Sequence, residues 1–280
     1  MKNHFLSSAS SASLPRKEST MKIGIHLNAH PCPIEERLSL MKKHGFDTTF
    51  CFSTVTNLEE VMALCKQYDI TVENYHAPFS HVQDMWLDLP EGDQMLAELM
   101  EAVDTCKKYR VDTLVVHVSA QNAPTTDIGL SRFDRLIAHA RENGITLAFE
   151  NLSSKLSKLA HMLEEYPEVG FCWDTGHEFA FAHGKQFMPL YGDRIAALHV
   201  HDNFCVHMGD HHMIPYDGSI DFDRVAAHLA ASNYQKSIML EAMARRTEAY
   251  LAMSADEFYQ RAAEAANRLA REVERIRAAR

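Results

Sequence analysis

Short hydrophobic runs typical of β-strands alternate with longer amphipathic runs eight times along this chain, and this alternation most constrains its fold. The predicted strands cover residues 22–27, 47–52, 71–75, 113–117, 146–150, 170–174, 196–201 and 237–241. Several, such as DTLVVH, have little polar interruption, which is typical of parallel strands covered on both faces. Eight strand–helix units without an internal linker predict an α/β fold, a single (β/α)₈ barrel.

The segments between the strands have the apolar spacing of helices. Residues 92–109 and 57–68 carry apolar side chains at helical intervals, and Gly144 is placed to end the helix before the fifth strand. Residues 254–280 predict a long helix with a charged outer face. A doubly wound open sheet is the alternative, but no glycine-rich phosphate turn follows the first strand.

Composition and charge bound the domain organisation and the compartment. Residues 21–280 are expected to form one catalytic domain, and the Ser-rich residues 1–20 a flexible N-terminal extension rather than a signal peptide. With a net charge of -10, the chain has no general attraction for nucleic acid or acidic membranes. No apolar run is long enough to span a membrane. The six cysteines have no CxxC pairing, as in reduced cytoplasmic proteins; they are Cys32, Cys51, Cys65, Cys106, Cys172 and Cys205.

Nine side chains that can bind a metal ion lie at or just beyond the predicted strand ends. They are His76, His117, Glu150, Asp174, His177, His199, Asp210, His212 and Glu241. The carboxyl ends of barrel strands converge on one pocket, where several carboxylates are costly to bury without a cation. Mixed imidazole and carboxylate ligands suit Zn²⁺, Mn²⁺, Fe²⁺ or Co²⁺ better than Mg²⁺ or Ca²⁺. Because nine ligands exceed the needs of one ion, one to three ions per chain are expected.

Four residues beyond the nine are candidates for contact with a substrate, namely His26, His201, Arg245 and Arg246. His199 and His201 are two apart in one strand and therefore face the same side, which leaves their roles ambiguous. His26 ends the first strand at the right depth for the pocket. Arg245 and Arg246 form the one basic pair near the mouth, as a phosphate contact or as solvated surface. No Gly-x-Ser-x-Gly elbow or P-loop is present.

The order of the motifs HAPF, VVH, FEN, WDTGH, HVHDN, DHH and LE resembles the xylose isomerase-like TIM-barrel superfamily over residues 21–271. That superfamily holds proteins named sugar phosphate isomerases or epimerases, and the endonuclease IV family. The resemblance to the epimerases implies one divalent ion held by Glu150, Asp174, His199 and Glu241. The two glutamates would transfer the proton at a metal-bound enediolate, with His177 touching the substrate.

The resemblance to endonuclease IV implies three zinc ions instead. The first would be held by His76, His117 and Glu150, the second by Glu150, Asp174, His199 and Glu241, and the third by His177, Asp210 and His212. The choice of His199 over His201 rests on its H-x-x-D spacing to Asp202, which fits both families.

Two departures weigh against a DNA enzyme. Basic inserts that could follow a DNA backbone are absent after the strands, and PYDGSIDF is close to the GxGxIDW form of the isomerase branch. The sequence therefore predicts a metal-dependent isomerase or epimerase of a small sugar or sugar phosphate. Hydrolysis of a small phosphoester is the alternative, and a non-catalytic binding protein is a third class. Homo-oligomers are common among similar proteins, but no sequence feature predicts one.

Overall fold

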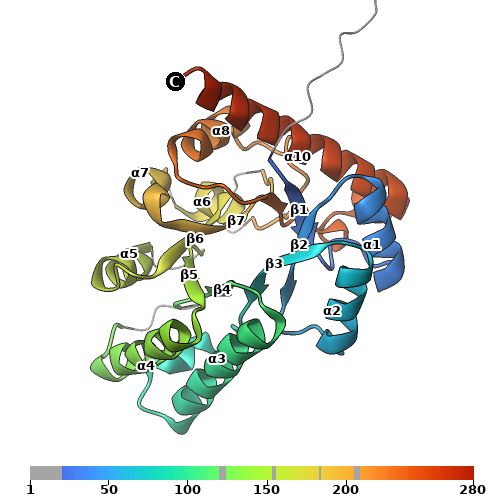
Figure 1. Ribbon diagram of the computed structural model, residues 1–280. Coiled ribbons are helices and arrows are strands. Elements are labelled where there is room, and N and C mark those ends of the chain that lie inside the picture. Colours follow the sequence, from blue (N-terminus) through green and yellow to red (C-terminus); the bar gives the residue numbers. More distant parts are fainter. Residues whose placement is uncertain (1–20, 120–123, 153–155, 183, 205–208) are drawn as a thin grey trace, which may run out of the picture.

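The strands of the computed structural model form a nearly closed parallel barrel (Figure 1). The structure describes residues 21–119, 124–152, 156–182, 184–204 and 209–280, so the expected flexible extension and Cys205 lie outside the described residues. The strands are β1 (Ile23–His26), β2 (Thr48–Phe52), β3 (Thr71–His76), β4 (Thr113–Val116), β5 (Thr146–Glu150), β6 (Gly170–Asp174), β7 (Ile195–His199) and β8 (Ile238–Leu240). Their order is β7-β6-β5-β4-β3-β2-β1-β8.

Val200 closes the ring between β7 and β8. Its amide donates to the Met239 carbonyl, and its carbonyl accepts from the Glu241 amide, both at 2.8 Å. The predicted (β/α)₈ barrel is confirmed, and the open-sheet alternative is wrong.

Helices surround the barrel and connect successive strands (Figure 1). They are α1 (Ile34–Lys43), α2 (Leu58–Gln67), α3 (Pro90–Tyr109), α4 (Asp127–Asn143), α5 (Leu156–Glu165), α6 (Thr175–Phe181), α7 (Met188–Tyr191), α8 (Phe222–Ala231), α9 (Glu248–Leu251) and α10 (Ala255–Ala278). Short 3₁₀ turns are η1 (Val82–Trp86), η2 (Gly192–Arg194) and η3 (Ala244–Arg246). None of the described helices is long and apolar enough to cross a membrane.

Local chemistry sets the helix ends. The Thr126 hydroxyl accepts from the Gly129 amide at 3.2 Å and begins α4, and Gly144 ends it at a φ of 71°. The Ser254 hydroxyl caps α10 in the same way. The seventh and eighth strands end at His199 and Leu240, earlier than the predicted 201 and 241, and beyond His199 the pairing with β8 continues only as an isolated bridge at Val200.

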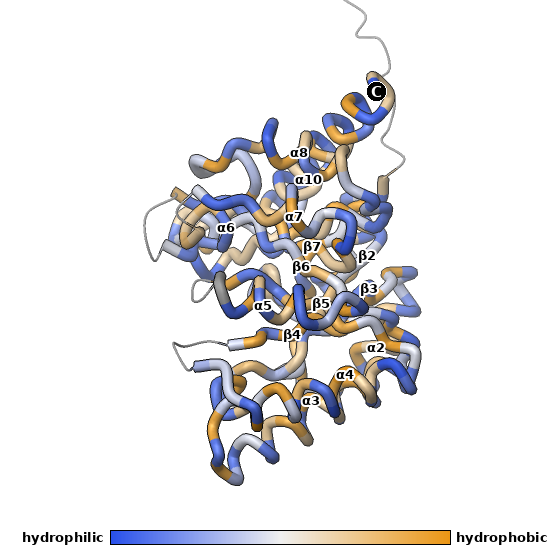
Figure 2. Tube along the Cα trace, turned by 90° about the vertical axis from the view of Figure 1, so that its left-hand side faces the viewer, coloured by the Kyte–Doolittle hydropathy of each residue, from blue (hydrophilic) through white to orange (hydrophobic). Residues whose placement is uncertain are grey.

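The apolar core has two parts. The larger lies between the barrel and the helices, whose hydrophobic residues are coloured orange along the trace in Figure 2. The smaller consists of Val115, Ala148, Cys172 and Ala197, which lie inside the barrel. These small side chains form an apolar floor beneath the strand ends. Polar groups above this floor depend on one another, or on a ligand, for their partners.

Candidate metal centre

A cavity of about 360 Å³ opens at the carboxyl ends of the strands. It is lined by Phe52, Thr54, His76, Phe79, His117, Glu150, Leu152, His177, Asp210, His212, Glu241, Met243, Arg245 and Arg246. Seven of the nine predicted ligands belong to this lining. The other two, Asp174 and His199, are fully buried.

The nine residues gather into three groups, and within each group one ligand atom per residue lies within 4.8 Å of the others. We call them the first, second and third groups. They are His76, His117 and Glu150; Glu150, Asp174, His199 and Glu241; and His177, His201, Asp210 and His212. These are the sets that the resemblance to endonuclease IV implies, with His201 added to the third; Glu150 and His199 also form a fourth group with the thiol of Cys172.

Glu150 joins the first two groups through its two carboxylate oxygens. Its Oε2 lies 3.1 Å from Nε2 of His76 and 3.0 Å from Nε2 of His117. Its Oε1 lies 3.2 Å from Nδ1 of His199. This carboxylate is therefore placed to bridge two adjacent cation positions.

Three of the imidazoles are oriented by backbone carbonyls. Nδ1 of His76 lies 2.9 Å from the carbonyl oxygen of the next residue, and Nδ1 of His177 lies 3.1 Å from that of Asn151. Nδ1 of His212 lies 2.9 Å from the carbonyl oxygen of Glu241. When Nδ1–H donates to a carbonyl, Nε2 keeps its lone pair and points into the cluster, as in metal-binding histidines.

Several buried polar atoms of the second and third groups have no hydrogen-bond partner among the residues that the structure describes. They are Oδ2 of Asp174, Nε2 of His199, both ring nitrogens of His201, Oδ1 of Asp210 and Oε2 of Glu241. Unpaired buried acceptors cost free energy. A cation with these nitrogen and oxygen ligands would satisfy them, so the residues present fit a divalent metal ion.

The two shared glutamates have opposite ionisation behaviour. Burial opposes ionisation of Glu150, but His199, His117 and His76 together hold the pKa of this carboxyl well below its usual range. Burial raises the pKa of Glu241 well above its usual range, and the Asp174 and Glu150 carboxylates add to the effect. The carboxyl groups of this site therefore do not all ionise unless a cation neutralises part of their charge.

The surrounding histidines and acids support this conclusion. Burial lowers the pKa of His117 and that of His212 to about 4, so both rings are neutral ligands at pH 7. For Asp210, burial is outweighed by a hydrogen bond from His212, and the pKa falls to about 2. For Asp174, burial is outweighed by His177 and His201, which lower its pKa.

The other predicted contact residues lie in different surroundings. His26 is fully buried, and its ring lies 4.9 Å from that of Phe50 and 4.7 Å from that of Phe52. It is not part of the cavity lining, and substrate contact by His26 stays a prediction. Arg245 does line the cavity, with a terminal nitrogen 3.6 Å from the sulfur of Met243. Arg246, beside it, has a nitrogen 3.8 Å from Oδ2 of Asp210.

Two supporting residues, Asn151 and Asp202, were not among the site residues expected from the sequence. The Asn151 side chain donates to the Asp174 carbonyl at 2.7 Å and accepts from the Asp174 amide at 2.8 Å, which locks β5 to β6. The carboxylate of Asp202, the last residue of H-x-x-D, accepts from the amides of Gly218 and Ile220. Asp202 therefore organises the loop after β7, and the FEN and HVHDN motifs carried the only signal for both residues.

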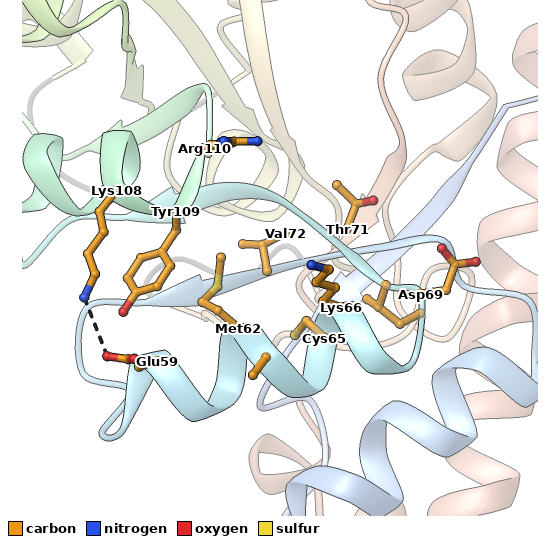
Figure 3. Close-up of a pocket in the computed structure, with 12 residues that line it drawn as sticks. Glu59, Met62, Cys65, Lys66, Asp69, Thr71, Val72, Lys108, Tyr109 and Arg110 are labelled. Atoms are coloured by element: carbon orange, nitrogen blue, oxygen red, sulfur yellow. Dashed lines mark ion pairs between the residues drawn. The ribbon is translucent and has the colours of Figure 1, made fainter.

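A second hollow, of about 540 Å³, lies outside the barrel between α2 and the end of α3 (Figure 3). Within its lining Lys108 lies 3.7 Å from Glu59, and Asp69 pairs with Lys42 outside it. None of the three ligand groups reaches it. The chemistry of the described residues therefore concentrates at the barrel mouth.

Comparison with known proteins agrees with this geometry. A family model described as xylose isomerase-like TIM barrel matches residues 38–269. The chain belongs to this family.

An uncharacterized protein, y4fM of Sinorhizobium fredii, is 34% identical over 145 residues, which cover 49% of this chain and 45% of that protein. A "Probable endonuclease 4" of Trichlorobacter lovleyi is 24% identical over 173 residues, covering 55% and 57%. The chain thus spans about half the length of these curated relatives.

Solved structures share the fold at low sequence identity. A D-tagatose 3-epimerase-like protein superposes with a TM-score of 0.72 at 17% identity, covering 92% of this chain and 99% of that one. The IolI protein with a bound zinc atom gives 0.70 at 16%, covering 91% and 99%. A D-allulose 3-epimerase from Methylomonas sp., in complex with D-allulose, gives 0.68 at 17%, covering 89% and 96%. Most members of such a family are isomerases, epimerases or endonucleases, so the chain is expected to be an enzyme.

Proposed function

We propose that this protein is a divalent-metal-dependent isomerase or epimerase of a small sugar or sugar phosphate. One observation carries the proposal: Glu150 and Glu241 belong to the same four-residue group and line the same cavity, although they come from strands separated by β6 and β7. Two carboxylates that reach one substrate from different sides can remove a proton and return it. The epimerases with the same fold support this assignment.

The roles of the residues follow from their positions. A divalent ion at the second group would supply Lewis-acid polarisation of neighbouring substrate oxygens. Glu150 and Glu241 then act as base and acid at the carbon beside the carbonyl. Phe52 and Phe79 offer apolar contact to the substrate and help to exclude water from the reacting centre.

The size and charge of the cavity favour a small molecule. A volume of about 360 Å³ lies at the low end of the range for small-molecule pockets. Arg245 and Arg246 are the arginines of its lining, and we assign them contact with a phosphate when the substrate carries one. No long basic surface accompanies them in the lining, so nucleic acid is disfavoured as substrate.

A second function, hydrolysis of a small phosphoester at several ions, is supported by a separate observation. Glu150 faces the His76–His117 pair with one oxygen and His199 with the other. Carboxylates that bridge two ions are typical of two-metal hydrolases. The partial match to a probable endonuclease 4 supports the same alternative.

Solvent deuterium exchange separates the two functions. Protein purified without chelator and loaded with Mn²⁺, Co²⁺ or Zn²⁺ is incubated in D₂O with D-allulose, D-tagatose and their phosphates. We expect deuterium at the carbon beside the carbonyl, and more than 10²-fold slower exchange for Glu150→Gln and Glu241→Gln. His117→Ala should keep most of the exchange. No exchange with any sugar, together with phosphate release from small esters that His117→Ala abolishes, would establish the hydrolase instead.

A further inference from the structure

The hollow between α2 and the end of α3 has an apolar floor on the outer side of the barrel. Cys65, Ile70 and Val72 are buried in its lining, and Met62 and Tyr109 are half-buried there (Figure 3). Val72 belongs to β3, so the hollow reaches the barrel wall itself. Its volume of about 540 Å³ falls within the range of small-molecule pockets, whose walls are mostly apolar. The floor therefore suits a flat apolar group.

The charged side chains of the lining leave an excess of positive charge. They are Glu59, Lys66, Asp69, Lys108 and Arg110. Oε2 of Glu59 lies 3.7 Å from Nζ of Lys108, and Oδ2 of Asp69 lies 2.7 Å from Nζ of a lysine outside the hollow. In the part of the chain that the structure describes, Lys66 and Arg110 have no ion-pair partner. Both acids are therefore paired, and two cations remain for a negatively charged ligand.

The backbone of Arg110 indicates that its side chain has a role. Arg110 follows α3 with a φ of 58°, in the left-handed region that favours glycine. The helix α4 ends in the same way, but there the residue is Gly144, at a φ of 71°. An arginine in this conformation costs free energy that glycine does not, and such positions are typical of ligand-binding sites. The turn alone favours glycine, so the residue type points to a task for the guanidinium group.

We propose that this hollow is a second binding site, separate from the barrel mouth, for small anions that carry a flat apolar ring. Aryl carboxylates and aryl phosphates belong to this class. The ring contacts Met62 and Val72, and the negative group faces Lys66 and Arg110, which form charge-assisted hydrogen bonds with it. An uncharged sugar suits the hollow less well, because the apolar floor leaves its hydroxyl groups without partners.

The first test is NMR of the protein with ¹³C in its methionine methyl groups, titrated with 2-naphthoate. Met62 lines the hollow, whereas Met243 lines the cavity at the barrel mouth, and Met62→Leu and Met243→Leu assign the two signals. We expect a saturable shift of the Met62 signal. A shift of the Met243 signal alone would place the ligand at the mouth and overturn the proposal, as would no shift of either signal at millimolar 2-naphthoate.

The uncharged analogue 2-naphthamide tests the class of ligand. It has the same ring system but lacks the negative group, so we expect it to bind at least about 5-fold more weakly than 2-naphthoate. Equal affinities of the two compounds would show that the cations do not contribute, and the hollow would then not be an anion site.

The second test uses Arg110→Gly, which separates binding from folding. Glycine relieves the left-handed backbone, so the urea midpoint should rise, while binding of 2-naphthoate weakens by about 5- to 10-fold. Lys66→Gln should weaken binding in the same way. Lys107→Gln is the matched control, because Lys107 also lies at the end of α3 but donates to Asn143 at 2.7 Å, outside the hollow.

Wild-type affinity in both Arg110→Gly and Lys66→Gln would overturn the proposal, and so would an equal loss in Lys107→Gln. These measurements depend neither on catalytic activity nor on the residues of the candidate metal centre. The proposed reaction can therefore fail while this site stands, and the reverse.

Discussion

At the scale of single residues, the cluster is defined by charges that do not balance without a cation. Glu150 is held ionised by three imidazoles, while burial and the neighbouring carboxylates favour the protonated form of Glu241. The two residues are of the same type, so their different ionisation states follow from the side chains that surround each of them. The chemistry of the site therefore changes when a positive ion enters.

We expect metal binding to release a proton from Glu241. Because its pKa is raised, this carboxyl keeps its proton to higher pH than an exposed glutamate does. The cation needs the deprotonated ligand, so metal affinity rises with pH. Calorimetric titration with Zn²⁺ in two buffers of different ionisation enthalpy measures the number of protons released. Glu241→Gln should reduce it.

Glu178→Gln is the matched control for that experiment. Burial also raises the pKa of Glu178, but its carboxylate accepts from Trp173 and from the amide of Phe187, outside the three groups. Its removal should leave proton release unchanged. An equal effect of the two substitutions would show that Glu241 is not the source of the proton.

Gly176→Ala should destabilise the protein by about 1–3 kcal/mol, since overpacking of a filled interior costs this much. The added Cβ would lie 1.9 Å from Cε1 of the fully buried ring of His201. In Gly192→Ala, by contrast, the nearest atom is the end of Met188 at 3.4 Å, and we expect little or no loss. The urea concentrations at the unfolding midpoints of the two variants test this expectation. Equal midpoints would mean that the His201 ring can yield.

At the scale of elements, the site depends on how β5, β6 and α6 meet. Asn151, directly after β5, binds both backbone groups of Asp174, and its own carbonyl oxygen lies 3.1 Å from Nδ1 of His177. One residue thus sets the positions of ligands from two groups. The alternation of side chains along the strands directs these ligands into the barrel. The hydrogen bonds of Asn151 set the distances between them.

Asn151→Ala is expected to weaken metal binding by about 10- to 100-fold, as for other residues that orient ligands. It should also destabilise the fold by about 1–3 kcal/mol, because buried backbone groups of Asp174 lose their partners. Competition with a chromophoric chelator measures the affinity. Asn143→Ala, at the end of α4, removes an amide that binds the His139 carbonyl, far from the site in the chain, and should leave affinity unchanged. Unchanged affinity in Asn151→Ala would refute the positioning role.

At the scale of the whole molecule, the buried cluster ties folding stability to pH. In the metal-free protein the pKa values of His117 and His212 are about 4, against about 6.5 in the unfolded chain. The folded state therefore binds fewer protons between pH 6.5 and 4. Stability falls with decreasing pH in that window, by up to about 1.4 kcal/mol per pH unit for each ring.

Glu241 acts in the opposite sense, because its raised pKa makes the folded state bind an extra proton above the usual glutamate range. Glu241 therefore offsets part of the slope that the two histidines produce. Urea unfolding of chelator-treated protein at pH 7, 6 and 5 measures it. His117→Gln should flatten the slope, and bound Zn²⁺ should raise stability at every pH at which it stays bound. A steeper slope in the variant would contradict the assignment.

The sequence by itself determined the barrel and the depth of the ligands. Strand periodicity and the position of each strand end are local properties, so Glu150 and Asp174 could be placed at the mouth before any contact was known.

The tertiary structure alone decided which side chains share a group. His201 could not be separated from His199 by pattern, since both face inward, and only the folded distances join it to His177, Asp210 and His212. His26 has the depth expected from the sequence, and only the folded structure shows that its ring packs against those of Phe50 and Phe52. Periodicity fixes the direction of a side chain, whereas its partners depend on strands and loops far apart in the chain.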